Sequence, residues 1–215
     1  MRYAKLAIAM AAASVLALGG PVLAATNDAD TPAAQAESGD AMVNWFGGEA
    51  YTGEPALDVT AALVKAGGGA ENFDFSTALV AMLGEDTVNA EVKKLSEQYG
   101  EDKVQGFVDG MTYAIKTGLR LAGEAGIELP EPADLEGQDL ARALVEGGTA
   151  PDGKFWAGRL FDVAVSHDLH NQIMEDIDEN FGHDADMNTH RILNQAMYDV
   201  AQALGMEDVG LADLH

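Results

Sequence analysis

The chain contains two stretches that align with each other without gaps, LVAMLGEDTVNAEVKKLSEQYG (residues 79–100) and FDVAVSHDLHNQIMEDIDENFG (residues 161–182). In both stretches, apolar residues recur every three or four positions, the spacing that keeps one face of an α-helix buried. A glycine ends each stretch, and an acidic segment with helical periodicity follows it. The pattern predicts two similar helical hairpins related by a pseudo-twofold axis. The alternative is chance similarity between amphipathic helices.

Helical periodicity also covers most of the sequence around these stretches. The strongest pattern starts at Glu101 and keeps apolar side chains on one stripe from Val104 to Ala122. No run of residues alternates in the way a half-buried strand does, so the sequence predicts an all-α fold, a helical bundle. Shorter helices are expected over 56–66, from a cap at Asp74 or Ser76 to Leu83, from a cap at Asp86 to Tyr99, and over 138–145.

The N-terminal segment has the features of a secretory signal peptide. Arg2 and Lys5 precede an apolar run over residues 6–18, and small residues follow at the positions that a signal peptidase reads. The apolar run is shorter than the roughly 20 residues that span a bilayer. We therefore expect residues 1–24 to be removed by cleavage after Ala24, which leaves a periplasmic or secreted protein without a membrane anchor.

The rest of the chain divides into a leader and one domain. Residues 25–41 (ATNDADTPAAQAESGDA) are small and polar, and they cannot bury enough surface to order themselves, so a flexible acidic leader is expected. Residues 42–215 suffice for a single helical domain with a buried core. Trp45, Phe46 and Tyr51 begin this domain and are expected to anchor it as an aromatic strap across the helices.

Charge and cysteine content exclude several classes of function. The 215 residues include 36 Asp and Glu but only 12 Lys and Arg, for a formal net charge of -24. Nucleic acid and anionic membrane surfaces repel such a chain, whereas a cationic or metal ligand is attracted to it. The absence of cysteine excludes disulfides, a thiol nucleophile and a thiolate metal site. A homodimer remains open.

Four of the five histidines occur within the 24 residues from His167 to His190. If residues 158–179 form one helix, His167, His170 and Met174 lie on its apolar stripe. Asp186 and His190 share the apolar face of the helix that follows the turn at Phe181 and Gly182. An antiparallel pairing of the two helices brings imidazoles from both to one level, with His170 opposite Asn194.

This arrangement predicts a site for a transition metal or haem. Neutral imidazole binds Zn, Cu, Ni or haem iron, and a thioether favours copper or haem. The alternative is that these are core histidines hydrogen-bonded to carbonyl groups and carboxylates. The expected metal ligands are His167, His170, Asp186 and His190. The expected cofactor-binding residues are His167, His170, Met174 and His190.

Two other kinds of site receive little support. The segment DIDENFGHDAD (176–186) resembles a calcium loop in its spacing of oxygen side chains, but Phe181 and Met187 stand where an EF-hand needs glycine and glutamate. A helix end rich in solvated acids is the preferred interpretation. Consecutive residues on a helix point about 100° apart, so Ser166-His167-Asp168 cannot form a hydrolase triad by itself.

The sequence therefore predicts an exported helical-bundle binding protein whose site is on the C-terminal hairpin. The second hypothesis is a structural or partner-binding periplasmic protein without a cofactor. The third is a hydrolase-type enzyme that uses the same histidines as general acid or base, and no residue can be assigned as catalytic on the sequence alone.

Overall fold

The computed structural model describes residues 51–212. The expected signal peptide, its cleavage site and the acidic leader lie outside the described residues, as do Trp45 and Phe46. Within that range the all-α prediction is confirmed, and the two strands have two residues each. The elements are α3 (Leu57–Ala66), α4 (Phe75–Leu83), α5 (Glu85–Tyr99), α6 (Glu101–Glu124), α7 (Gly137–Gly148), β1 (Lys154–Phe155), α8 (Ala157–Val165), α9 (His167–Phe181), α10 (His183–Ala203) and β2 (Gly210–Leu211).

Most helix ends lie where the local sequence predicts them. The side chain of Asp74 accepts a hydrogen bond from the backbone N–H of Thr77 at 2.7 Å, so the expected cap of α4 is confirmed. The expected cap at Asp86 is wrong, because α5 already begins at Glu85, directly after Gly84. Glycine provides the positive φ of 81° that the sharp junction between α4 and α5 requires.

The single helix expected over 158–179 is interrupted at Ser166. α8 ends at Val165, α9 begins at His167, and Ser166 between them has a φ of 110°, a conformation that side-chain-bearing residues rarely adopt. Its hydroxyl accepts a hydrogen bond from the N–H of Leu169 and so caps α9. The apolar stripe predicted for one continuous helix is therefore shared between two helices that meet at an angle.

The two aligned stretches form a structural repeat. From Phe75 to Ala157 is a shift of 82 positions, and the same shift superposes the bounds of α4 on those of α8, the bounds of α5 on those of α9, and the start of α6 on the start of α10. We call residues separated by this shift matched positions. The residues that precede α4 and α8, Asp74 and Trp156, have nearly the same backbone angles, φ -135° and ψ 125° against φ -130° and ψ 124°.

The repeat extends to α3 and α7, which the gapless alignment missed. DVTAALVKAG (58–67) and DLARALVEGG (139–148) correspond at a shift of 81, and EPA precedes both, at 54–56 and 131–133. Both end at a glycine under a buried phenylalanine: a Cβ on Gly67 would lie 2.3 Å from the ring of Phe73, and one on Gly148 would lie 2.2 Å from the ring of Phe155. The first repeat is thus α3 to α6 and the second is α7 to α10.

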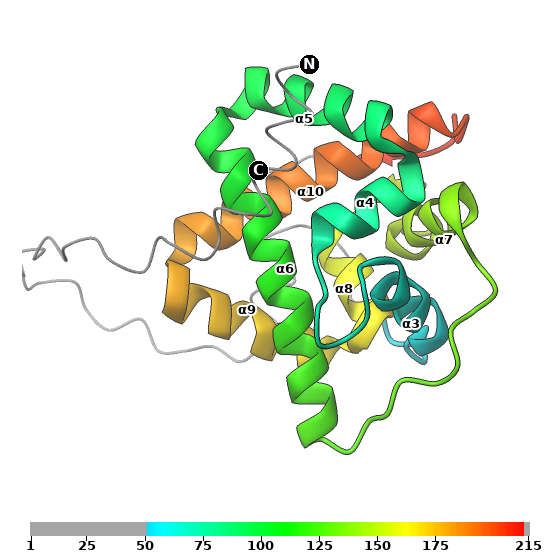
Figure 1. Cartoon of the computed structure of the whole chain (residues 1–215), viewed down its shortest axis with the longest axis vertical. Helices are drawn as coiled ribbons and strands as arrows, with labels where there is room; N and C mark the ends of the chain where they lie inside the picture. The colour runs from blue at the N-terminus through cyan, green and yellow to red at the C-terminus, as the bar shows by residue number, and fades with distance from the viewer. Residues whose placement is uncertain (1–50, 213–215) are drawn as a thin grey trace, which may run out of the picture.

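The helices pack reciprocally, as a pseudo-twofold relation requires. α6 contacts α10 and α3 contacts α7, so each packs on its own counterpart. α6 contacts α9 as α10 contacts α5, and α4 contacts α7 as α8 contacts α3. Figure 1 shows α6 running through the molecule, with α9 on one side and α3, α4 and α7 on the other. One continuous apolar core joins the repeats.

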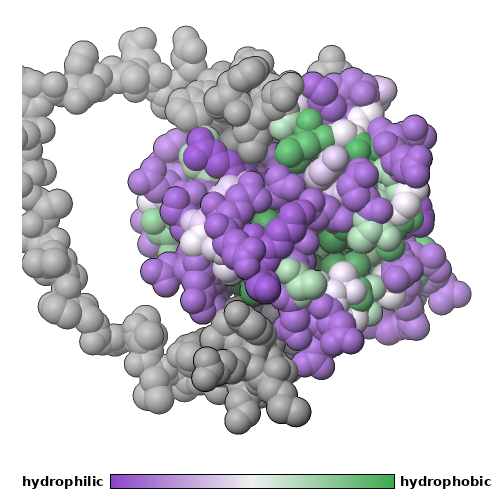
Figure 2. All heavy atoms as spheres, turned by 90° about the horizontal axis from the view of Figure 1, so that it is seen from above, coloured by the Kyte–Doolittle hydropathy of each residue, from purple (hydrophilic) through white to green (hydrophobic). Residues whose placement is uncertain are grey.

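The visible surface is mostly polar, as expected for a chain with this many acidic residues. The face in Figure 2 is largely hydrophilic, with small apolar patches between the polar side chains. In the described range, no helix combines the length and the hydropathy that crossing a membrane requires. β1 and β2 pair in parallel and fasten the segment after α10 beside the start of α8.

Candidate metal centre

Four buried polar side chains lie together where α8, α9 and α10 meet. They are two carboxylates and two imidazoles, and each is at most 9% exposed. Groups of this kind are seldom buried without a specific partner. The matched position of every one of them in the first repeat is a valine. In chain order the pairs are Asp162 and Val80, His170 and Val88, Asp186 and Val104, and His190 and Val108.

The carboxylate of Asp162 accepts hydrogen bonds from two histidines and from one backbone N–H. Its Oδ1 atom lies 2.7 Å from Nδ1 of His170 and 3.0 Å from Nδ1 of His167, and its Oδ2 accepts a hydrogen bond from the backbone N–H of Tyr51 at 3.1 Å. Burial acts to raise the pKa of Asp162, but the hydrogen bonds from the two imidazoles outweigh it, so the pKa lies below its usual value of 3.8. Asp162 is therefore ionised at neutral pH.

His170 is held as a neutral imidazole with a defined tautomer. Burial lowers its pKa below 6.5 and outweighs the opposing hydrogen bond to Asp162. Because an ionised carboxylate only accepts hydrogen bonds, Nδ1 of His170 carries the ring proton and Nε2 carries a lone pair. That Nε2 atom is buried and has no hydrogen-bond partner among the described residues. A lone pair of this kind is available to a metal ion.

Asp186 and His190 form a second carboxylate–imidazole pair, one turn apart on α10. Nδ1 of His190 lies 2.9 Å from Oδ1 of Asp186 and 3.2 Å from its carbonyl oxygen. Both neighbours are acceptors, so Nδ1 is again the protonated nitrogen. Both side chains are 1% exposed. The backbone carbonyl of Asp186 accepts the hydrogen bond that orients His190, and the buried carboxylate of Asp186 lies beside the same nitrogen.

The rings of His170 and His190 lie near each other at the centre of the cluster. Their centroids lie 6.2 Å apart and their planes are inclined by 39°. An ion about 2 Å from a nitrogen of each ring places the two centroids roughly 5–6.5 Å apart. Phe161 stacks on His170, with centroids 5.3 Å apart and an interplanar angle of 15°, and it closes one side of the site.

His167 is close to the cluster but differently engaged. Its ring centroid is 6.3 Å from that of His170, and one ligand atom each from Asp162, His167 and His170 lies within 4.8 Å of the others. Its Nε2 atom, however, accepts a hydrogen bond from the side-chain amide of Asn171 at 3.3 Å. The break at Ser166 turns the start of α9 out of the expected stripe, and the side chain of His167 is 26% exposed.

The structure assigns structural positions to two other predicted residues. Met174 is 1% exposed and belongs to the apolar core. Asn194, expected opposite His170, accepts a hydrogen bond from the backbone N–H of Ala157 at 2.7 Å and so fixes the start of α8. Asp162 was not among the predicted ligands, because a continuous helix places it off the apolar stripe. Its match to Val80 in the gapless alignment was the available signal.

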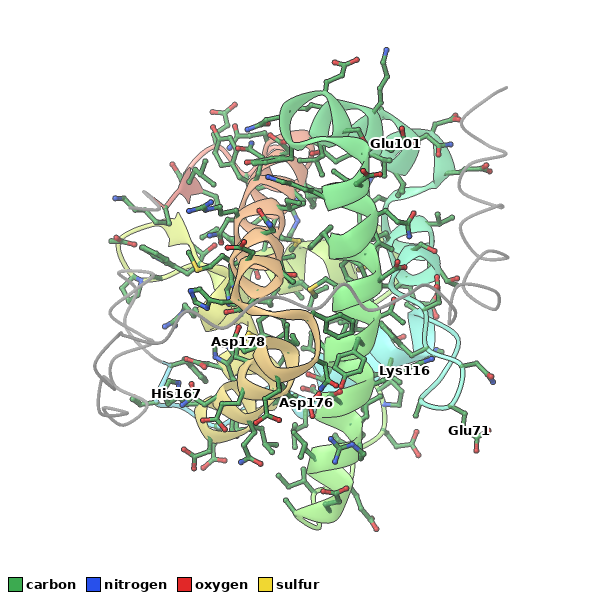
Figure 3. The ribbon with its side chains drawn as sticks, turned by 90° about the vertical axis from the view of Figure 1, so that its left-hand side faces the viewer. Glu71, Glu101, Lys116, His167, Asp176 and Asp178 are labelled. Carbon is green, nitrogen blue, oxygen red and sulfur yellow. The ribbon has the colours of Figure 1, made fainter. Side chains whose placement is uncertain are left out.

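The acidic segment before Gly182 is a helix end and not a calcium loop. Residues 176–181 belong to α9, so their oxygens do not converge as in an EF-hand. Asp176 points toward α6, where it accepts a hydrogen bond from the hydroxyl of Tyr113 and lies 3.7 Å from Arg120 (Figure 3). The helix end of the preferred interpretation is therefore confirmed, but not all of its acids are solvated, because Asp186 is buried.

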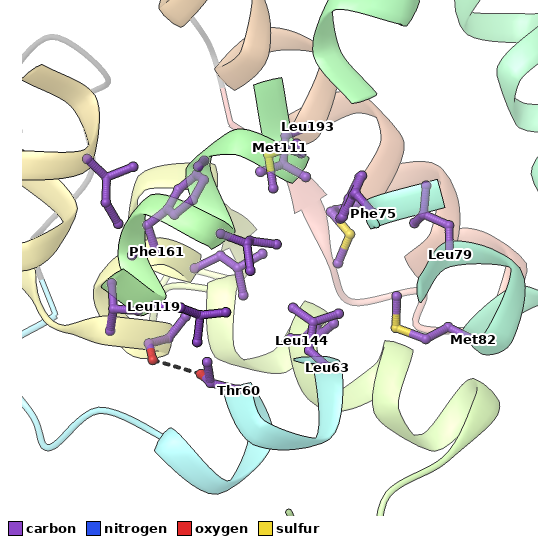
Figure 4. Close-up of a pocket in the computed structure, with 18 residues that line it drawn as sticks. Thr60, Leu63, Phe75, Leu79, Met82, Met111, Leu119, Leu144, Phe161 and Leu193 are labelled. Atoms are coloured by element: carbon purple, nitrogen blue, oxygen red, sulfur yellow. Dashed lines mark hydrogen bonds between the residues drawn. The ribbon is translucent and has the colours of Figure 1, made fainter. Parts of the chain in front are cut away.

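The cavity next to Phe161 does not resemble a haem pocket. It is apolar, has a volume of about 70 Å³ and is lined by no histidine, and one wall carries the hydrogen bond from Thr60 to the carbonyl of Ala164 (Figure 4). Pockets for large organic ligands occupy roughly 300–1,000 Å³. Haem binding stays a prediction that this geometry does not favour.

The cluster offers imidazole nitrogens and carboxylate oxygens in a buried setting, and the Asp162 carboxylate is hydrogen-bonded to His170. Such a set suits a borderline divalent ion. The hydroxyl of Ser166, the residue before His167, accepts the hydrogen bond that caps α9. No family model, no curated protein and no solved structure matches this chain.

Proposed function

We propose that this protein binds a transition-metal ion through His170 and His190, with Asp162 and Asp186 holding the two imidazoles. The proposal includes export, with the site acting in a periplasmic or secreted binding protein. Catalysis is not part of it.

One observation carries the proposal: the fold forms the same hairpin in its first repeat with valines at all four positions. The carboxylates and imidazoles are therefore not needed to build the hairpin. Burying them costs more than burying valine, because charged and polar groups lose their hydration. A ligand that binds only to these groups supplies the reason for this difference.

The ligand set limits the choice of ion. Imidazole nitrogen with carboxylate oxygen suits Zn²⁺, Cu²⁺ and Ni²⁺, whereas Cu⁺ prefers thiolates, which this chain lacks, or thioethers, and the predicted thioether of Met174 belongs to the apolar core. The negative charge of the chain favours capture of a cation. In the absence of an ion, Nε2 of His170 is a buried polar atom without a hydrogen bond to any described residue.

The test uses untagged protein stripped with a chelator and titrated with Cu²⁺. We expect an electron paramagnetic resonance spectrum with hyperfine splitting from two imidazole nitrogens. His170→Val and His190→Val each introduce the residue of the matched position and should abolish that spectrum while preserving the helical circular dichroism. Asp168→Asn, at an exposed acid on α9, is the control and should leave it unchanged. Binding without nitrogen splitting, or equal spectra in the valine variants, contradicts the proposal.

A further inference from the structure

A second group of metal-ligand side chains lies at the junction of α9 and α10. Asp178 comes from the last turn of α9, and His183 and Asp186 come from the first turn of α10, on the other side of Gly182. One ligand atom from each of the three lies within 4.8 Å of the others. Nδ1 of His183 is 3.5 Å from Oδ2 of Asp178. The chain reversal therefore brings two carboxylates and an imidazole together.

Asp186 provides an independent reason to place a cation here. It is 99% buried, and neither of its carboxylate oxygens has a hydrogen-bond partner among the described residues, although Oδ1 lies near His190. The Oδ1 atom of Asp178 is also buried without a partner in this part of the chain. Carboxylate oxygens removed from water need a donor or a cation, because ionised groups lose most of their hydration on burial.

Within the described range, no Lys or Arg lies within ion-pair distance of Asp178 or Asp186. The described Lys and Arg ion pairs are with other acids, and the basic side chains near these two carboxylates are His183 and His190. The matched residues of the first repeat are Ser96, Glu101 and Val104, so the first repeat has no such cluster. We call the proposed site at His170 and His190 the inner site. There too, only the second repeat carries the metal-ligand side chains.

We infer that Asp178, His183 and Asp186 form a second site, which binds a divalent first-row cation such as Mn²⁺ or Zn²⁺. Carboxylate oxygens suit Mn²⁺, and a mixed set of carboxylate and imidazole also suits Zn²⁺. The side chains of His183 and Asp178 are 50% and 36% exposed, so the site opens to solvent on one side. Asp186 connects it to His190 of the inner site. This inference goes beyond the proposed function and does not require an ion between His170 and His190.

The test is a Mn²⁺ titration of the full chain, with free Mn²⁺ followed by electron paramagnetic resonance. We expect one Mn²⁺ bound per wild-type chain, and at least tenfold weaker binding in Asp178→Ser and His183→Ala. Asp184→Asn, at an exposed acid beside the site, is the control and should bind as wild type. His170→Val should also bind as wild type, so failure of the inner site and failure of this site give different results.

A second measurement keeps the inference testable if a variant misfolds. In wild-type protein, bound Mn²⁺ should broaden the imidazole proton resonances of His183 before those of His167. No Mn²⁺ binding to wild type, unchanged affinity in both Asp178→Ser and His183→Ala, or broadening that spares His183 would overturn the inference.

Discussion

The hairpins α4–α5 and α8–α9 share their helix bounds, but the two repeats carry different residues at four matched positions. The first repeat has valine at 80, 88, 104 and 108, and the second has Asp162, His170, Asp186 and His190. Three of the valines are buried, whereas Val80 is 39% exposed and its counterpart Asp162 is covered by the backbone of Tyr51. The difference separates what the fold needs, a helical hairpin, from what the second repeat adds, a polar site.

The junction between the first two helices of each hairpin also differs between the repeats, and again the second repeat has the less favourable residue. Gly84 joins α4 to α5 with a φ of 81°, and Ser166 joins α8 to α9 with a φ of 110°. A side chain in this conformation is strained, and the strain lies beside His167 at the edge of the site. The second repeat thus combines buried polar side chains and a strained backbone in the same region, and both lower the stability of the fold.

The largest effect on stability is expected from Asp162→Ala. The change leaves the imidazole N–H groups of His167 and His170 and the backbone N–H of Tyr51 without their acceptor. Breaking a buried polar network of this kind costs about 3–5 kcal/mol in the free energy of unfolding. Urea denaturation measures the loss, with exposed Asp168→Ala as the control. A loss below about 1 kcal/mol would show that Asp162 does not hold the site together.

The opposite result is expected when all four polar residues become the matched valines, in the variant D162V/H170V/D186V/H190V. Replacing a buried polar set by apolar side chains is often neutral or stabilising by about 1–4 kcal/mol. We expect this four-valine variant to fold at least as stably as metal-free wild type. Loss of the native circular dichroism would mean that the second hairpin requires its polar groups.

The stability of wild type and that of the four-valine variant should depend differently on pH. The unfolded chain protonates His170 below about 6.5, whereas burial keeps its pKa lower in the folded state, so wild type loses stability as the pH falls from 6.5 toward that lower value. Asp162 adds a further loss below pH 3.8, as the pH falls through its lowered pKa. The four-valine variant should lack both contributions. Equal pH profiles from urea denaturation would contradict this account.

A smaller effect is expected from Glu91→Gln in the first repeat, where the second repeat has the buried Ile173. Burial and the neighbouring Asp199 raise the pKa of Glu91 from 4.5 to about 7. The folded protein therefore binds a proton that the unfolded chain releases, and stability falls as the pH rises from 4.5 to 7. Because Glu91 is only half-buried, solvent screening reduces the gain from Glu91→Gln at pH 8 to about 1 kcal/mol. Urea denaturation at pH 8 should show this gain, and at pH 4.5 none.

An equally small effect is expected at the two helix junctions. Ser166→Gly removes the strain of a positive φ but also the long hydrogen bond to Leu169, so a net stabilisation of about 1 kcal/mol is expected. Gly84→Ser introduces that strain into the first repeat and should destabilise it by a similar amount. Melting temperatures of the two variants measure both effects, and shifts of the same sign would show that the junctions are not equivalent.

Much of this fold could be predicted from periodicity and glycine position. The bounds of α6, the end of α5 at Gly100 and the gapless match of α4–α5 to α8–α9 follow from the sequence. The extension to α3 and α7 could not be found by a gapless comparison, because the segment from Gly148 to α8 is one residue longer than the segment from the corresponding Gly67 to α4. Surface loops absorb such insertions at little energetic cost.

The members of the buried polar cluster were predicted only in part, for a reason that lies in one residue. His170, His190 and Asp186 do come together, but Ser166 gave no sign of a helix break, because serine seldom adopts a positive φ. The continuous helix that the sequence predicts would place His167 on the buried stripe and Asp162 away from it. Comparing the repeats position by position identifies Asp162, since a charged residue at the position of a valine needs an explanation.

The most direct test of the central claim compares metal content between wild type and the double variant H170V/H190V. Both untagged proteins are stripped, loaded with Zn²⁺, desalted and analysed for bound metal by mass spectrometry. The double variant keeps Asp178, His183 and Asp186, so the junction site contributes equally to both proteins. We predict one more Zn²⁺ per chain in wild type than in the double variant. Equal zinc content in the two folded proteins would contradict the claim that the second repeat carries a metal site where the first has valines.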